Sequence, residues 1–132
     1  MHQFDVRTGS RTEMVEITDR VREAIRGSGM KQGLCVVYCP HTTAAITINE
    51  NADPDVVRDL LLWYNHAVPH EQPGFRHAEG NSDSHIKATM IGQSVTLLVE
   101  SGAPVLGRWQ GIFFCEFDGP RTRTVQVQVL GS

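Results

Sequence analysis

The stretch from His77 to His85, with the sequence HAEGNSDSH, places two imidazoles and two carboxylates in a polar run without apolar periodicity. Imidazole is the usual neutral ligand of a borderline metal such as Zn²⁺, and neighbouring carboxylates or amides can orient it. His41 lies in a turn-like segment between two apolar runs and would supply the third protein ligand that an open metal site needs. The alternative is that His41 bonds to the backbone of its own turn while His77 and His85 are surface loop residues.

Two arginines begin the clearest alternation of the chain, in which Val125 and every second residue up to position 129 are apolar. Because side chains two positions apart on a strand share a face, we expect Arg121 and Arg123 to point to the buried side. Buried arginines usually meet a carboxylate or an anion, and their planar fork suits phosphate. Two interpretations remain open: an anion site, or salt bridges to Glu116 and Asp118 across the preceding turn.

Short strands must position these side chains. Turn residues at 8–10 separate two strands over 3–8 and 12–17, which we expect to pair with each other as a hairpin. The apolar run 34–38 shows no alternation, a pattern typical of a central strand covered on both faces. Further strands are expected over 44–49, 94–100, 109–117 and 121–129.

Capping residues predict three helices, and between the second and third lies an irregular segment, 67–81, that shows neither period. A long irregular segment in a short chain is typical of a functional loop. The helices are expected to run from Thr18 or Asp19 to the Gly-Ser-Gly cluster at 27–29, from Asp53-Pro54 to before Pro69, and, capped by Ser82, Asp83 or Ser84, from His85 to Ile91.

Composition limits the class of protein. The length of 132 residues predicts one domain, and a net charge of −3 without a basic stripe excludes the usual nucleic-acid partners, which leaves a small molecule as the expected ligand. No apolar run approaches membrane-spanning length, so no membrane partner is expected and the predicted location is the cytoplasm. Cys35, Cys39 and Cys115 have no disulfide spacing. Cys35 and Cys39, four positions apart, could be thiolate ligands, but we interpret them as small buried hydrophobes on one face of a strand.

Several motifs at their mutual spacings make the chain resemble the YjbQ-like family, described as secondary thiamine-phosphate synthases or as uncharacterised proteins. The resemblance covers nearly the whole chain, 1–132. Its motifs here are PHTT at 40–43 with NEN at 49–51, the stretch 77–88, Gly107 with Trp109-Gln110, and EFDGPR at 116–121. One departure is Arg108, where the family usually has threonine; we expect its side chain to be exposed, with its stem over an apolar surface.

The resemblance implies a fold, a metal and an assembly. The fold would be α+β, a single compact domain with a two-layered, largely antiparallel β-sheet core and a few helices. Family members assemble as trimers, so a homotrimer is implied. They hold a divalent metal, usually zinc, through three histidines that match His41, His77 and His85, with phosphate-like anions close by. A small phosphorylated molecule is therefore the expected ligand.

The activity that the resemblance implies is thiamine-phosphate synthase-type, which joins a pyrimidine methyl diphosphate to a thiazole phosphate. This reaction could be secondary to another role of the site. The alternatives are a zinc-dependent hydrolase of a small phosphate ester and a non-enzymatic module that binds a metal and a phosphorylated metabolite. In such a site, Glu50 or Asp83 would accept a proton. Anionic charge would be stabilised by Lys87, Arg121 and Arg123. The ligand would be oriented by Asn51, Asn81 and Gln110, and its pyrimidine would stack on Trp109 or Tyr38.

Overall fold

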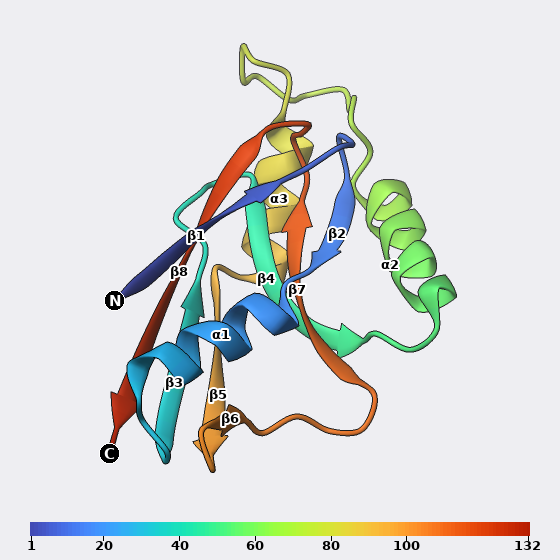
Figure 1. Cartoon of the computed structure of the whole chain (residues 1–132). Coiled ribbons are helices and arrows are strands. Elements are labelled where there is room, and N and C mark those ends of the chain that lie inside the picture. The colour runs from blue at the N-terminus through green and yellow to red at the C-terminus, as the bar shows by residue number, and fades with distance from the viewer.

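The computed structural model describes all residues from 1 to 132, which form two antiparallel sheets and three helices (Figure 1). The five-stranded sheet has the order β1-β8-β3-β5-β6, and the three-stranded sheet has the order β2-β7-β4. The expected α+β fold with an antiparallel sheet core is therefore confirmed. The elements are β1 (His2–Arg7), β2 (Glu13–Glu16), α1 (Thr18–Ser28), β3 (Gly33–Tyr38), β4 (Ala44–Glu50), α2 (Pro54–Ala67), α3 (Ser82–Ile91), β5 (Ser94–Glu100), β6 (Ala103–Pro104), β7 (Gln110–Glu116) and β8 (Thr122–Gly131).

The main core lies between the sheets and under α1. Alternate residues of β8 are buried there, as the apolar period of that strand predicts, and α1 adds the apolar stripe of Val21, Ala24 and Ile25. A smaller cluster on the other side of the three-stranded sheet joins Ala88 of α3 to Phe117. The helix α3 thus packs against the outer face of that sheet, close to β4.

The predicted hairpin between the first two strands is wrong. Residues of β1 pair with β8 in the larger sheet, with Phe4 opposite Val125, whereas β2 pairs with β7 in the smaller sheet, with Val15 opposite Phe114. The turn between β1 and β2 therefore carries the chain from one sheet to the other. A hairpin turn and such a crossing have the same polar residues, so local composition does not distinguish them.

The prediction that 34–38 is covered on both faces is also wrong. Cys35 and Val37 point into the core, but Leu34 and Tyr38 are exposed on the outer face of the five-stranded sheet. The strand that is covered on both faces is β7, which lies between the core and the outer cluster. Its residues 111–116 are all buried.

Helix boundaries follow the expected chemistry. The Asp53 side chain accepts a hydrogen bond from the Asp55 N–H at 2.9 Å, and Pro54 occupies the first turn of α2. Gly29, with φ of 73°, ends α1 in the left-handed conformation that glycine adopts most readily. The third helix begins three residues earlier than expected, at Ser82, and the Asn81 side chain does not cap it. This side chain makes other contacts, described below.

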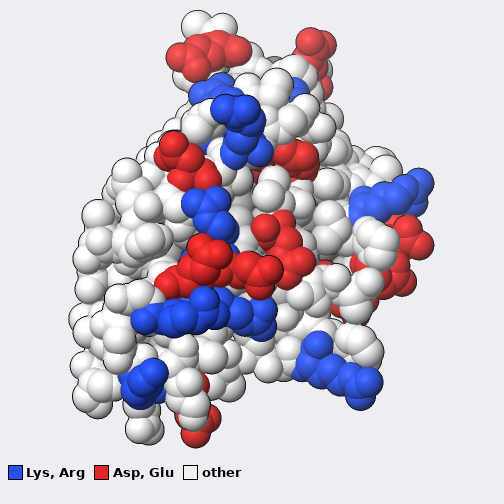
Figure 2. All heavy atoms as spheres, in the orientation of Figure 1, with Lys and Arg blue, Asp and Glu red and all other residues white.

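One end of the molecule gathers the elements that can form a site. The β1–β2 turn, the β7–β8 turn, the irregular segment 68–81 and the start of α3 lie together there (Figure 1). On the face that carries α1, acidic and basic side chains are interspersed, with no continuous stripe of one sign (Figure 2). None of the helices is both long enough and apolar enough to cross a membrane.

Candidate functional site

His77 is held in one tautomer by a chain of side chains. The Asp118 carboxylate, which can only accept, receives hydrogen bonds from Arg121 Nη2 at 3.2 Å and from Asn81 Nδ2 at 2.8 Å. The Asn81 amide oxygen therefore faces His77, whose Nδ1 lies 2.8 Å away and must carry the proton. As a neutral imidazole, His77 thus has its lone pair on Nε2.

A second imidazole stands beside the first. The ring centroids of His77 and His85 are 5.3 Å apart, and their planes are nearly perpendicular, at 88°. The loop before α3 supplies His77, which is exposed, and the first turn of α3 supplies His85, which is half-buried. Two of the three predicted metal ligands, His77 and His85, therefore lie side by side.

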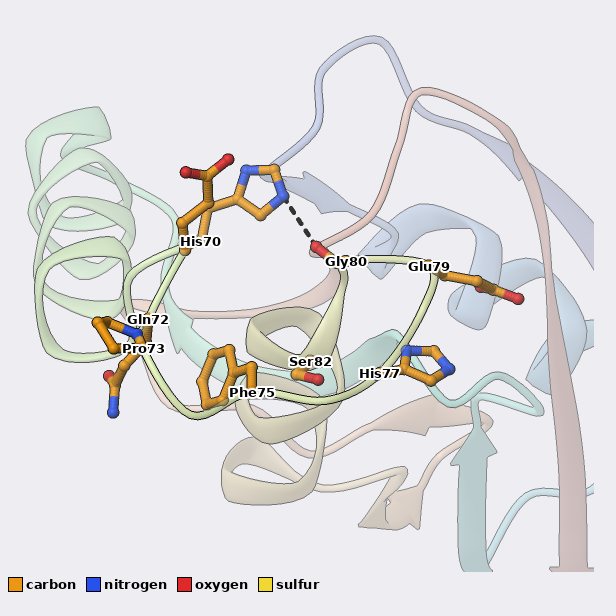
Figure 3. A pocket seen from close by; sticks show the side chains of 9 residues that line it. His70, Gln72, Pro73, Phe75, His77, Glu79, Gly80 and Ser82 are labelled. Atoms are coloured by element: carbon orange, nitrogen blue, oxygen red, sulfur yellow. Dashed lines mark hydrogen bonds between the residues drawn. The ribbon is translucent and has the colours of Figure 1, made fainter.

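The irregular segment 68–81 curves around a cavity of about 650 Å³, to which His77 contributes (Figure 3). The ring of chain is closed by His70, whose Nε2 donates to the Gly80 carbonyl oxygen at 3.0 Å. A second cavity, of about 550 Å³, lies toward α3 and includes His85. Phe75, His77 and Ser82 line both cavities, so His77 stands where the two hollows meet.

His41 is not part of this pair. Its Nε2 accepts a hydrogen bond from the Thr124 backbone N–H at 2.9 Å, at the start of β8. Burial lowers the pKa of His41 below its ordinary value, and the nearby Arg123 guanidinium lowers it further. The ring nitrogen that could otherwise bind a metal is therefore engaged with a backbone group, although this group belongs to β8 and not, as the alternative interpretation had it, to the turn of His41 itself.

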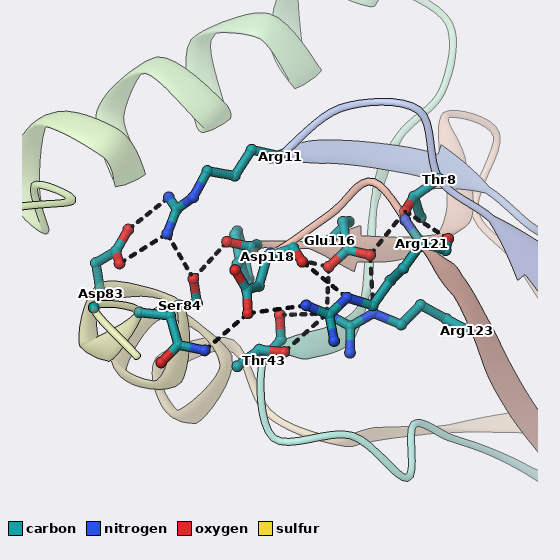
Figure 4. A network of polar contacts seen from close by, with 12 residues as sticks. Thr8, Arg11, Thr43, Asp83, Ser84, Glu116, Asp118, Arg121 and Arg123 are labelled. Atoms are coloured by element: carbon teal, nitrogen blue, oxygen red, sulfur yellow. Dashed lines mark hydrogen bonds and ion pairs between the residues drawn. The ribbon is translucent and has the colours of Figure 1, made fainter. Parts of the chain in front are cut away.

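The two arginines that were expected to point inward are separated. Arg123 is 3% exposed and donates from Nε to Glu116 at 2.8 Å, while a second bond joins its Nη2 to the same carboxylate (Figure 4). Arg121 is half-exposed and bonds to Asp118. Of the two interpretations, the salt bridges are present, and the prediction that Arg121 faces the buried side is wrong. That side chain precedes β8 and so lies outside the alternation of the strand.

A second buried ion cluster ties α3 to the β1–β2 turn. Arg11 donates to both oxygens of Asp83, at 3.0 and 3.2 Å (Figure 4). Lys87 donates to the same carboxylate at 3.2 Å. Lys87 also bonds to Asn65 of α2. Burial raises the pKa of Asp83, but these hydrogen bonds outweigh it and lower the pKa below its ordinary value. Neither Asp83 nor Lys87 lines either cavity.

The other predicted ligand-binding residues lie at the far end of β4 and β7. In this pair of strands, Ala44 near His41 faces Glu116, and Glu50 faces Gln110. At about 3.3 Å per residue, the two ends of β4 are roughly 20 Å apart. Glu50, Asn51, Trp109 and Gln110 are therefore not brought together with the paired histidines.

At that far end, the polar side chains bond to one another. Asn51 donates to Glu16 at 2.8 Å, and the Gln110 side-chain oxygen accepts from the Gly107 N–H at 2.7 Å. Trp109 is 54% exposed, and the Arg108 guanidinium lies 4.8 Å from its ring centroid. Arg108 is thus an exposed residue over an apolar side chain, as its neighbourhood predicted.

Three residues of the site were missed in the sequence. Asp118 was interpreted only as a salt-bridge partner, although it orients Asn81 and so His77. Phe75 and Ser82 line both cavities but lie in a segment without periodicity. The one signal in the sequence was the position of Asn81 directly before a helix. In the structure Asn81 is 7% exposed, so its amide needs partners within the protein.

Sequence comparisons with known proteins all point to the same family. Residues 2–132 match the model of the UPF0047 protein YjbQ-like family. A UPF0047 protein of Methanocaldococcus jannaschii is 48% identical over 131 residues, which are 99% of this chain and 94% of that protein. The UPF0047 protein YugU of Bacillus subtilis is 48% identical over 128 residues, 97% of each chain.

The predicted function is wrong. The relatives are named only as UPF0047 proteins, which gives no support for thiamine-phosphate synthase or hydrolase activity. No group of three or more histidine, cysteine, aspartate or glutamate side chains in the chain could hold a metal ion, and His41 Nε2 accepts a backbone hydrogen bond instead. The binding module that needs this metal is excluded with it. The divalent metal cofactor, the small phosphorylated ligand, the homotrimer and the cytoplasmic location stay predictions.

Solved structures agree with the sequence comparison. A crystal structure of an uncharacterised conserved protein of the YjbQ/UPF0047 family from Clostridium acetobutylicum superposes with a TM-score of 0.96 at 46% identity, and the match covers 98% of this chain and 100% of that chain. A hypothetical protein from Aeropyrum pernix gives a TM-score of 0.94 at 38% identity, with 99% and 98% covered. This chain belongs to the UPF0047 protein YjbQ-like family.

Proposed function

We propose that the paired histidines form a proton-transfer site, and that the protein is an enzyme that moves a proton between positions of a small polar molecule. The observation that carries this proposal is the tautomer of His77. A general base needs an accessible lone pair and a fixed orientation. The ring is fixed because His77 Nδ1 donates to the Asn81 amide oxygen while Asn81 itself donates to Asp118, and Nε2 has no hydrogen-bond partner in the chain. His77 lines both cavities.

His85 fits the role of the second group in such a transfer. Its ring lies beside that of His77 at 5.3 Å and lines the second cavity. No side-chain partner holds its ring nitrogens, so His85 is free to exchange a proton with a ligand that lies in the second cavity. One neutral and one protonated imidazole would give the base and the acid that an isomerisation requires.

The buried cations Arg123 and Lys87 are not the groups that bind a ligand. Arg123 is bonded to Glu116, and Lys87 is bonded to Asp83. Each buried cation is therefore already neutralised by a carboxylate and is not available to a ligand. We infer that both pairs hold the end of the fold together beneath the histidines.

Exchange with heavy water tests the proposal without a known substrate. A base that takes a proton from carbon returns deuterium in D₂O, so pools of small amines, acids and sugars incubated with the protein should include a compound that gains mass. The same compound should not exchange with His77→Gln. The matched control is His66→Gln, which removes an exposed histidine of α2 outside both cavities and should leave exchange intact. Exchange that continues in His77→Gln would overturn the proposal.

A further inference from the structure

We propose that the natural ligand is zwitterionic, a small molecule that carries an ammonium group at one end and an acidic group at the other. This inference rests on the proposed function, since it names the substrate class of the same site. It comes from the opposite charges of the two cavities that meet at His77. Each cavity selects one end of the ligand.

The first cavity is complementary to an ammonium group. Glu71 and Glu79 belong to its lining, and no lysine or arginine does. The Glu79 side chain points away from the ring of chain, whereas Phe75 lies inside it (Figure 3). An aromatic face attracts a cation, and rim carboxylates raise the local concentration of cations. Because His70 donates from Nε2 to Gly80, its Nδ1 is also an acceptor.

The second cavity has the opposite charge. Arg76 belongs to its lining, and no aspartate or glutamate does. The Arg76 side chain is exposed, and it takes part in no ion pair within the chain. Unlike Arg121 and Arg123, it is therefore free to bind a carboxylate or phosphate of a ligand.

His77 stands between the two halves. Because Phe75, His77 and Ser82 line both cavities, a ligand with its ammonium in the first and its acid in the second would lie against His77. The proton that His77 removes would then be one on the carbon chain between the two charged groups of the ligand. The location of His77 between an acidic and a basic cavity would thus orient a substrate for the proton exchange proposed above.

Three probes of similar size separate the contributions. We would titrate the ¹⁵N-labelled protein with 4-aminobutyrate, with butyrate, which lacks the amine, and with butylamine, which lacks the acid. The expected result is that 4-aminobutyrate binds several-fold tighter than either of the others, with amide shifts confined to 70–86. Equal affinities for all three, or an absence of shifts in this segment, would overturn the inference.

Charge variants assign the two ends. Arg76→Gln should weaken 4-aminobutyrate and butyrate binding about two- to fivefold and leave butylamine unchanged, as for a partly exposed ion pair. The double variant Glu71→Gln, Glu79→Gln should weaken 4-aminobutyrate and butylamine instead. Arg108→Gln and Glu100→Gln, both outside the cavities, are the matched controls. A reversed or uniform pattern would contradict the assignment.

The proposed ligand class and the proposed proton transfer can be tested independently of each other. His77→Gln should retain the preference for 4-aminobutyrate, because the charged groups remain, while it loses deuterium exchange. If the wild type shows exchange on some compound but no preference for the zwitterion, the ligand class is wrong and the proposed function stands. If the preference is present and no compound exchanges, the proposed function fails and the ligand class stands.

Discussion

Arg123 donates hydrogen bonds to the carboxylate of Glu116, seven positions earlier in the chain, and both side chains are buried beneath the β7–β8 turn. Removal of one partner leaves the other as an uncompensated charge, which costs about 3–5 kcal/mol. We therefore expect Arg123→Leu to lower the free energy of unfolding by that amount in urea denaturation. The control is Arg121→Gln, which breaks a half-exposed pair worth about 0–1 kcal/mol. Equal losses in the two variants would contradict the assignment.

Acid should unfold the protein through the same carboxylates. Burial raises the pKa of Glu116, but the hydrogen bonds from Arg123, the Asp118 N–H and Thr8 outweigh it and lower the pKa below its ordinary value, and the pKa of Asp83 is lowered in the same way. A carboxyl group with a lowered pKa contributes stability that is present above its unfolded pKa, about 4, and is lost as the pH falls through its folded pKa.

The measurement is the free energy of unfolding as a function of pH. We expect it to fall steadily from about pH 5 downward. In Asp83→Asn this slope should be smaller, although the variant is less stable at neutral pH. A stability that stays constant between neutral pH and the acid range would show that these ion pairs do not have the stated effect.

The end of β3 requires glycine opposite glycine. Gly33 pairs with Gly131 of β8, and a Cβ atom on Gly33 would lie 2.0 Å from the Leu130 carbonyl oxygen at a φ of 153°. We expect Gly33→Ala to destabilise the protein by at least about 1–3 kcal/mol, from backbone strain alone. Gly27→Ala is the control, because nothing lies within 4 Å of its Cβ and alanine favours the helix. Thermal unfolding of both variants checks the difference.

The three cysteines should be chemically inert. Burial raises the pKa of Cys35 and of Cys39 to about 11 and that of Cys115 to about 12. Since the thiolate is the reactive form, none of them should react with a disulfide reagent at neutral pH in the native protein, and all should react in denaturant. A thiol that reacts rapidly under native conditions would contradict their placement in the core.

Local signals predicted most elements but not their pairing. The alternation after Val125 was sufficient to predict the last strand, and Asp53-Pro54 was sufficient to predict the start of the second helix. Both predictions succeed because periodicity and capping are local properties of the sequence. The pairing of β1 with β8 depends on residues more than a hundred positions apart, and no turn signal encodes it. The expected hairpin failed for this reason.

The candidate site was predictable to the same extent. His77 and His85 belong to one segment, and a loop that leads into a helix brings them together. His41 lies on the connection between β3 and β4. The position of this connection relative to α3 depends on how the two sheets pack, which the sequence does not reveal. The role of Asp118 depends on a bond to Asn81 across 37 positions, which sequence spacing does not reveal.

The tautomer of His77 tests the central claim most directly. Long-range ¹H–¹⁵N correlation spectra of the wild type and of Asn81→Ala distinguish a protonated Nδ1 from a protonated Nε2 in a neutral imidazole. We predict Nδ1–H in the wild type, fixed by Asn81, and a shift toward the Nε2–H form in the variant. A neutral His77 that is protonated at Nε2 in the wild type would contradict the account, since no lone pair would then face the junction of the two cavities.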